Sequence, residues 1–447
     1  MLFVYVYVRS QGFLNIEPEA QDRVQSGRYR ILTMYSTILF FFILSSGILC
    51  LDAAPFNLTW PWNRKNVDPE VNMNASQLIL SKGYPCIEYS VLTDDGFILG
   101  VQRIPYGRNE TKYTPRPVVF LQHGLLCSST NWITNLANES LAFLLADAGY
   151  DVWLGNVRGN TYSQKHIRYT PDQVEFWDWS FDQMAEYDLP AMINYALNLT
   201  RRNQLYYIGH SQGTMIGFAG FSKNKELAKK VKTFYALAPV STVGNMTSPL
   251  RYLATFLPEI QFLFDLFGVK EFLPSDWFTK WLATDVCSPS SEIFCSSILF
   301  IICGFDVNNL NETRLPVYLA HTPSGTSVQN MVHFAQMVNS DLFQMYDYGS
   351  ADKNKAHYNV TVPPQYYPEN MTTPTAIFSG GMDWLADPED VKGLVPKIQH
   401  LVGNNFIAEY DHLDFIWGLS AADKIYKPII EKIGLAEADD KLRFNKR

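Results

Sequence analysis

The sequence is poor in charge, and what charge it has is not basic. Charged side chains make up 18% of the 447 residues, below the usual quarter, and Asp and Glu outnumber Lys and Arg by 44 to 36. The net charge of −8 leaves no dominant basic face that could release the counterions of a nucleic acid. We therefore expect no nucleic-acid partner.

Cysteine is also scarce for a chain of this size. A chain that is 47% hydrophobic can bury a large core, so it does not need a disulfide framework. No Cys-x-x-Cys and no His/Cys cluster has the spacing of metal ligands, so we expect no structural zinc and no cofactor. Cys287 and Cys295 are close enough in sequence to close a short loop. The six cysteines are Cys50, Cys86, Cys127, Cys287, Cys295 and Cys303.

Long apolar runs are absent except near the N-terminus. The run from Met34 to Leu51 follows Arg28 and Arg30 and precedes the small residues 52–55. This pattern is typical of a secretory signal peptide, which we place at residues 34–54. Residues 1–33 form an extra leader that a start at Met34 would omit. The alternative is an uncleaved signal anchor, since the run nearly spans a bilayer.

Glycosylation sequons are abundant. The pattern N-x-S/T occurs nine times, whereas roughly four occurrences are expected by chance. The excess indicates a protein of the secretory pathway, bound for the lysosome or the extracellular space. The candidate asparagines are Asn57, Asn74, Asn109, Asn138, Asn198, Asn245, Asn311, Asn359 and Asn370.

From about residue 90, short β-branched runs alternate with amphipathic stretches. This alternation predicts an α/β protein with a doubly wound, mainly parallel sheet. It breaks between residues 242 and 370, which we interpret as an inserted, mostly helical cap or lid between two parts of the core, 67–241 and 371–435. The aromatic surplus of the insertion either fills its own small core or roofs an apolar pocket. The expected strands are 97–104, 117–122, 151–156, 205–209, 232–239, 375–380 and 406–410.

The stretch YIGHSQGTM at residues 207–215 places Ser211 between two glycines. A chance G-x-S-x-G has a probability of roughly 0.1 in such a chain, so the bare pattern is only suggestive. A strand before Ser211 and small residues after it, including Gly217 and Gly220 facing the sheet, favour a nucleophile at a sharp strand-to-helix turn. The alternative is an ordinary serine in a surface turn.

A serine nucleophile needs a base and an acid. His412 follows the last expected strand at its carboxyl end, where the active sites of open α/β sheets lie. Asp383 follows the strand 375–380, whereas Asp387 precedes Pro388 and is typical of a helix N-cap. We therefore predict the order Ser211, Asp383, His412, which is that of α/β-hydrolases. We interpret His210 as local packing.

The developing oxyanion needs two backbone N–H donors. Gln212, directly after the nucleophile, supplies one. The loop after the strand 117–122 opens with His123 and Gly124, and Leu125 in this loop is the expected second donor.

These motifs belong to longer stretches that resemble the animal acid lipase family of gastric lipase and lysosomal acid lipase, which are α/β-hydrolases. The resemblance covers roughly residues 67–430. The matching stretches are 83–105, 121–135, 145–160, 209–214, 234–240, 321–330, 380–391 and 412–418, which include LQHGLLCSS, GHSQGT and HLDFIWG.

The resemblance implies a lipase that hydrolyses neutral lipid esters, triacylglycerol or cholesteryl ester, at a lipid–water interface. It implies that Ser211, Asp383 and His412 are the triad, with Leu125 and Gln212 as oxyanion donors. It also implies a cap disulfide and a free cysteine, which fall on Cys287, Cys295 and Cys303. It implies no stable protein partner. Cys127 and the leader depart from the family pattern.

Two other functions stay open at this point. One is a serine esterase or thioesterase of narrower substrate range, against which the long apolar cap argues. The other is a catalytically silent, lipid-binding homologue on the same fold, against which the intact set of candidate residues argues.

Overall fold

The computed structural model describes residues 68–110, 114–255, 270–272, 303, 304, 306 and 308–445. The leader, the signal peptide, Asn57, Cys287 and Cys295 lie outside these residues, so their assignments stay predictions. The boundaries of the core and the cap stay predictions as well.

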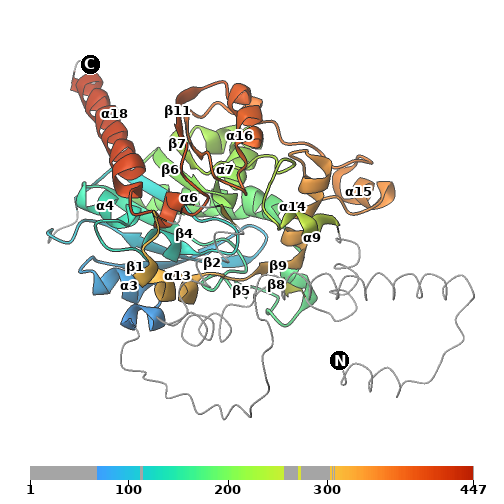
Figure 1. The fold of residues 1–447 in the computed structure, drawn as a ribbon, viewed down its shortest axis with the longest axis horizontal. Helices are drawn as coiled ribbons and strands as arrows, with labels where there is room; N and C mark the ends of the chain where they lie inside the picture. The colour runs from blue at the N-terminus through green and yellow to red at the C-terminus, as the bar shows by residue number, and fades with distance from the viewer. Residues whose placement is uncertain are drawn as a thin grey trace, which may run out of the picture. The chain divides into compact units, whose positions relative to one another are not determined.

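A nine-stranded sheet forms the centre of the described residues (Figure 1). Every neighbouring pair from β4 to β11 is parallel, whereas β1, β2 and β5 join the sheet antiparallel. The expected mainly parallel α/β sheet is therefore confirmed. Its order is β1 (Ile87–Leu92), β2 (Phe97–Ile104), β4 (Asp151–Gly155), β3 (Val118–Gln122), β6 (Leu205–His210), β7 (Val231–Leu237), β10 (Thr375–Gly380) and β11 (Leu401–Ile407), with β5 (Lys165–His166) beside β2.

The chain reverses its direction across the sheet after β4. It passes from β3 through α4 (Leu141–Asp147) to β4, then turns back through α6 (Leu189–Thr200) to β6 on the other side of β3. Because crossovers between parallel strands are right-handed, α4 covers one face, and α6 and α7 (Gln212–Lys223) cover the other. The carboxyl ends of β3 and β6 therefore form a switch point, the usual place for a binding crevice in such sheets.

An aromatic ladder fills the face under α7. Phe120, Tyr207 and Phe234 are register partners on β3, β6 and β7, with ring centroids 6.1 and 5.3 Å apart. A side chain at Gly217 would come within 3.0 Å of the Phe234 ring, so a glycine lets α7 approach the sheet. Gly220 does not face the sheet as predicted. A side chain at Gly220 would come within 2.9 Å of Leu189 Cδ2 on α6.

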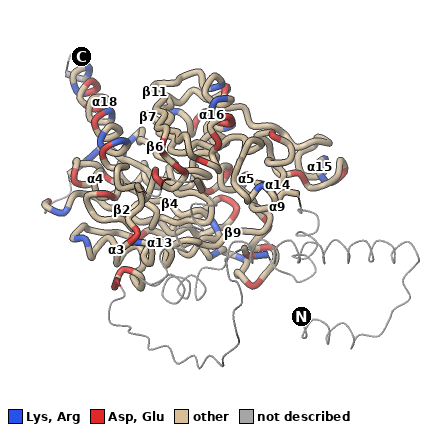
Figure 2. Tube along the Cα trace, in the orientation of Figure 1, with Lys and Arg blue, Asp and Glu red and all other residues tan. Residues whose placement is uncertain are grey.

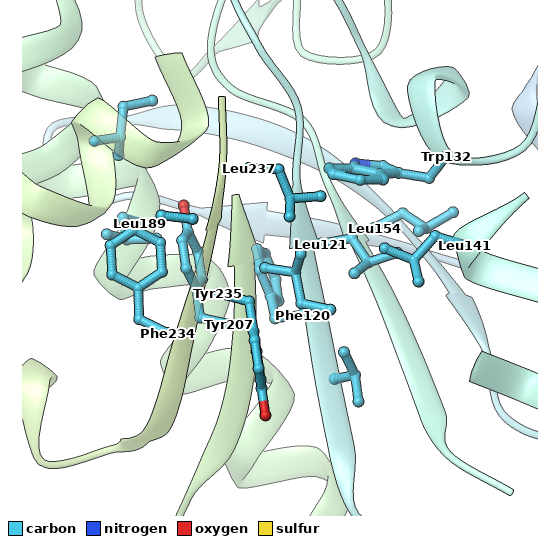
Figure 3. Packing of buried hydrophobic residues seen from close by; sticks show 14 of the residues in the cluster. Phe120, Leu121, Trp132, Leu141, Leu154, Leu189, Tyr207, Phe234, Tyr235 and Leu237 are labelled. Atoms are coloured by element: carbon cyan, nitrogen blue, oxygen red, sulfur yellow. The ribbon is translucent and has the colours of Figure 1, made fainter. Parts of the chain in front are cut away.

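On the opposite face, aliphatic side chains of β3 and β4 form a second layer. Figure 3 shows Leu121 and Leu154 of the central strands grouped with Leu141 of α4 and with Trp132. All four side chains are almost completely buried. Burial of such side chains stabilises a fold by about 1.5–3 kcal/mol each, so this layer and the aromatic ladder hold the sheet in place.

One strand prediction was wrong, and one edge strand was missed. The last strand, β11, runs from Leu401 to Ile407 and not over 406–410, and β1 was not predicted. Both strands lie at the edges of the sheet, where one face meets solvent. Phe406 is 61% exposed, and Gly403 and Asn404 are poor strand formers, so the periodicity that marks buried strands is weak here.

The other described elements surround this sheet. In the predicted cap, β8 (Glu271–Phe272) and β9 (Thr326–Ser327) form a small antiparallel pair. The cap helices are α9 (Arg251–Thr255), α13 (Leu315–His321), α14 (Val328–Ser340) and α15 (Ala351–Tyr358). Elsewhere lie α3 (Ala75–Ser81), α5 (Phe181–Gln183), α8 (Lys225–Ala228), α16 (Pro388–Leu394), α17 (Asp414–Trp417) and α18 (Lys427–Asn445). The short 3₁₀ and π turns include η3 (Ser129–Trp132), η5 (Met184–Asp188) and η10 (Ala422–Tyr426).

Helix α18 carries acidic and basic residues along its length (Figure 2). Its Glu437 accepts hydrogen bonds from Lys232 at 2.7 Å and from the Tyr206 hydroxyl at 2.8 Å. These contacts attach α18 to the amino ends of β6 and β7, away from the switch point. None of the helices in the described ranges is long and apolar enough to cross a membrane.

Candidate active site

Ser211 occupies the turn between β6 and α7 with φ 53° and ψ −122°. This conformation is rare for a residue with a side chain, and such strain typically marks a functional turn. A side chain at Gly209 would lie 2.8 Å from the Gly213 backbone, and one at Gly213 would lie 2.4 Å from the Gln122 carbonyl oxygen. The two glycines therefore permit the turn, as the motif predicts.

The loop after β3 lies directly against this turn. A side chain at Gly124 would come within 3.0 Å of Ser211 Cβ, so only glycine leaves room for the contact. The backbone N–H groups of Leu125 and Gln212 make no hydrogen bond to another described residue. Two free donors thus flank the serine, as the oxyanion prediction requires.

Asp383 and His412 are hydrogen-bonded to each other. His412 Nδ1 lies 3.0 Å from Asp383 Oδ1 and 2.9 Å from Oδ2, and both side chains are nearly inaccessible to solvent. Asp383 Oδ1 also accepts the backbone N–H groups of Leu385 at 2.9 Å and Ala386 at 2.8 Å. The carboxylate therefore holds the proton of the imidazole on Nδ1 and leaves Nε2 free to act as a base.

His210 connects the serine turn to the loop that carries His412. Its Nε2 donates to the His412 carbonyl oxygen at 3.0 Å, and the two rings are 4.9 Å apart. Burial, with the neighbouring His412, lowers the pKa of His210 well below its usual value, so this ring stays neutral. The interpretation of His210 as local packing was thus incomplete. Ser211 and His412 share no direct hydrogen bond in this structure, and such a contact commonly tightens only when substrate binds.

Asp387 has a different environment from Asp383. Its Oδ1 accepts the Glu389 N–H at 2.9 Å at the start of α16, and its Oδ2 accepts the Thr247 hydroxyl at 3.3 Å. This is the N-cap geometry that the sequence predicts for Asp387.

Sequence reasoning missed two acids beside His412. Asp411 Oδ1 accepts the N–H groups of Leu413 at 2.8 Å and Asp414 at 3.1 Å, and Asp414 Oδ2 accepts the Asp411 N–H at 2.7 Å. These bonds fix the turn that bears His412. Burial raises the pKa of Asp411 to about 6, and burial with the neighbouring Asp411 raises the pKa of Asp414 to about 9. The pattern D-H-x-D was the available signal.

Part of the predicted cap touches the residue after the serine. Asn330 of α14 donates from Nδ2 to Gln212 Oε1 at 2.9 Å. Gln212 Nε2 in turn donates to Met184 Sδ at 3.1 Å. Helix α14 therefore packs against the start of α7, and its position is coupled to the turn of Ser211.

Three cysteines lie in the described ranges, and none of them is in a disulfide there. Burial raises the pKa of Cys127 to about 12 and that of Cys303 well above its usual value, so both thiols are protonated. The Cys303 carbonyl oxygen accepts the N–H groups of Trp384 and His412, each at 3.3 Å. Residue 303 therefore links the loops that carry Asp383 and His412.

Eight of the nine sequon asparagines lie in the described ranges, at the surface. Asn311 is half-buried and the other seven are exposed. Asn245 differs in that its Nδ2 donates to Asp390 Oδ1 at 3.0 Å.

One cavity in the described ranges lies away from the serine turn. A cavity of about 490 Å³ lies at the far end of α7, lined by residues such as Asp182, Lys223 and Tyr366. None of the predicted site residues lines it. The described residues also hold no group of three side chains suited to a metal ion.

Known proteins with similar sequences are α/β-hydrolases and lipases. Residues 117–419 match the family described as alpha/beta hydrolase fold, and residues 75–136 match a partial alpha/beta-hydrolase lipase region. The chain is 55% identical to gastric triacylglycerol lipase of Rattus norvegicus, over 81% of this chain and 92% of that lipase. It is 54% identical to lysosomal acid lipase/cholesteryl ester hydrolase of Homo sapiens, over 81% of this chain and 91% of that enzyme.

Proposed function

Because this chain belongs to the α/β-hydrolase family of gastric and lysosomal acid lipases, we propose that Ser211, His412 and Asp383 form the catalytic triad of a lipase that cleaves neutral lipid esters. The observation that carries the proposal is the buried Asp383–His412 hydrogen bond, which is linked through His210 to the strained turn of Ser211.

Acylation uses the free nitrogen of His412. Nε2 takes the proton of Ser211 Oγ as the oxygen attacks the ester carbonyl carbon, and Asp383 stabilises the imidazolium that forms. The N–H groups of Leu125 and Gln212 bind the oxygen that becomes negative. His412 then gives its proton to the departing alcohol, and the acyl group stays on Ser211.

Deacylation repeats these steps with water. His412 Nε2 takes a proton from water, which attacks the acyl carbon in place of the serine. The intermediate collapses, Ser211 regains the proton and the fatty acid leaves. No metal or cofactor takes part in this scheme.

The substrate class follows from the family. The rat relative is named for triacylglycerol and the human relative for cholesteryl ester, and the chain is almost equally similar to both. We therefore propose that both ester types are substrates, taken from a lipid–water interface. Parallel assays on emulsified triacylglycerol and on cholesteryl ester measure the preference between them.

The proposed location is the secretory pathway, with the lysosome or the extracellular space as the destination. The exposed sequon asparagines support it, because a glycan needs an accessible amide. A glycosidase gel shift and N-terminal sequencing of the mature protein test this location. A product without glycans that retains residues 34–54 would contradict it.

Labelling with a fluorophosphonate probe tests the nucleophile. The protein should be labelled once, and Ser211→Ala should abolish labelling and lower kcat by about 10⁶-fold, while its melting curve shows a folded protein. If Ser211→Ala were labelled as well as the unchanged protein, another residue would be the nucleophile. If the unchanged protein were never labelled, the alternative of a silent lipid-binding homologue would hold.

A further inference from the structure

His123, at the end of β3, is buried, and its ring has three partners. Its Nε2 lies 3.2 Å from the Val157 backbone nitrogen and 3.1 Å from Asn160 Nδ2. The Asn160 amide is oriented by the Tyr162 N–H, which donates to Asn160 Oδ1 at 3.0 Å. Because both groups that face Nε2 are donors, Nε2 must be the acceptor. The proton of the neutral ring therefore sits on Nδ1.

His123 Nδ1 lies 2.8 Å from the carbonyl oxygen of Gly124, the next residue. In a trans peptide, the carbonyl of Gly124 and the N–H of Leu125 point in opposite directions in one plane. Whatever holds this carbonyl therefore also sets the direction of the Leu125 N–H. Burial lowers the pKa of His123 to about 4, so the ring keeps the same tautomer in a mildly acidic compartment.

The loop is held on its other side as well. Ser324 N–H donates to the Leu126 carbonyl oxygen at 2.7 Å, and Leu126 has a positive φ of 57°. Leu125 thus lies between two fixed peptides. Of the two fixing contacts, the one from His123 acts on the peptide plane that contains the Leu125 N–H.

We propose that His123 is a positioning residue for ester hydrolysis: its Nδ1–H holds the Gly124 carbonyl and so aims the Leu125 N–H at the oxyanion. This role rests on the proposed function, because it needs Leu125 to bind the oxyanion. The His123 ring makes its hydrogen bonds to Gly124, Val157 and Asn160, so it acts on the reaction through the Gly124 peptide.

Two substitutions distinguish the contact made by Nδ1 of His123 from the contacts made by Nε2. The amide nitrogen of His123→Asn stands where Nδ1 stood and can still donate to Gly124. The amide of His123→Gln reaches the place of Nε2 and can still accept from Val157 and Asn160. We expect His123→Gln to lower kcat about 10- to 100-fold on soluble p-nitrophenyl butyrate with KM unchanged, because an oxyanion donor acts in the transition state.

His123→Asn should keep most of the kcat even though it loses the Nε2 contacts and some thermal stability. A purely structural role predicts a different result, in which both variants lose kcat alike or only stability changes. Either of those results, or a lower kcat for His123→Asn than for His123→Gln, would overturn the proposal.

His166 provides the matched control. Its Nδ1 accepts the N–H groups of Arg168 at 3.0 Å and Tyr169 at 3.1 Å, and its Nε2 donates to the Asp95 carbonyl at 3.0 Å. Like His123, this ring accepts two N–H groups and donates to one carbonyl, but the roles of its two nitrogens are exchanged and it has no part in the serine turn. His166→Asn and His166→Gln should lower the melting temperature and leave kcat unchanged.

If the His123 variants do not fold, neutron diffraction of the unchanged protein still shows which nitrogen of His123 carries the proton, and this tests the proposal. A deuteron on Nδ1 and none on Nε2 supports the role, and a deuteron on Nε2 rejects it. The labelling of Ser211 is measured separately. Labelling that persists in Ser211→Ala refutes the triad, whereas equal kcat values of the two His123 variants in a labelled enzyme refute only the positioning role.

Discussion

The middle and the carboxyl end of strands β3 and β6 differ in backbone conformation and in the kind of side chain that they bury. In the middle, Phe120 and Tyr207 are aromatic neighbours in regular register, buried under α7. A few residues further on, Ser211 has a positive φ, and buried imidazoles replace the aromatic rings. Strain of this kind costs about 1–3 kcal/mol, so the carboxyl end is kept in place by the stability of the middle.

The comparison teaches that stability and chemistry are separable in this fold. Substitutions at the carboxyl end should change rates with little effect on folding, and those in the middle should do the reverse. The predictions below test this separation in order of expected size.

The largest expected effect in this series separates two neighbouring aspartates. Asp383→Asn should stay folded and lose about 10⁴-fold in kcat, because His412 is no longer held in the right tautomer. Asp387→Asn, which can still cap α16, is the matched control and should keep its activity. Steady-state rates and thermal melts of both variants measure this. If Asp387→Asn were the inactive variant, the acid would be misassigned.

In the middle of the sheet, Phe234→Ala should lower the free energy of unfolding by about 3–5 kcal/mol, since it removes one ring of the aromatic ladder. The kcat per folded molecule should hardly change. Phe406→Ala, on the exposed side of β11, is the control and should cost under about 0.5 kcal/mol. A large loss of kcat in folded Phe234→Ala would contradict the separation of the two regions.

The acid pair beside His412 should make the protein more stable in acid. The pKa of Asp411 is raised from 3.8 to about 6 and that of Asp414 to about 9, so the folded state holds these protons more tightly than the unfolded chain does. The stabilisation is complete below pH 3.8 and is lost as the pH rises through 6 and then towards 9.

Denaturant unfolding between pH 4 and pH 8 measures this effect. Other titratable groups face the pair as well: Asp306 lies near Asp414, and Asp383 and His412 lie near Asp411. The control is Asp414→Asn, which removes one carboxyl. In this variant the free energy of unfolding should vary less with pH. If it varied as steeply as in the unchanged protein, groups other than this pair would cause the pH dependence.

The smallest expected effect concerns the strain at Ser211. Ser211→Gly should be more stable than Ser211→Ala by about 1 kcal/mol, because glycine adopts a positive φ without a clash. Both variants should be inactive. Urea midpoints of the two proteins are the measurement, and equal midpoints would mean that the turn stores no strain.

Much of the sheet could be predicted because buried parallel strands have continuous apolar sequences. Strands β2 and β10 were predicted with their observed bounds, and β3, β4, β6 and β7 within two residues. The edge strands β1 and β11 could not be predicted as well, because a half-exposed strand tolerates polar residues and glycine. The candidate site could be assigned from motifs, since Ser211, Asp383 and His412 each follow a strand that ends at the same edge of the sheet.

The sequence by itself determined the α/β class, the family resemblance, and the types and order of the candidate residues. These features are local, because a sharp turn needs its glycines and a buried strand its apolar run. Only the tertiary structure decided that His210 reaches the loop of His412, that Asp411 and Asp414 fix that loop, and that His123 faces two donors. Each of these contacts joins side chains through hydrogen bonds whose direction depends on the placement of separate loops. No residue pattern along the chain encodes that placement.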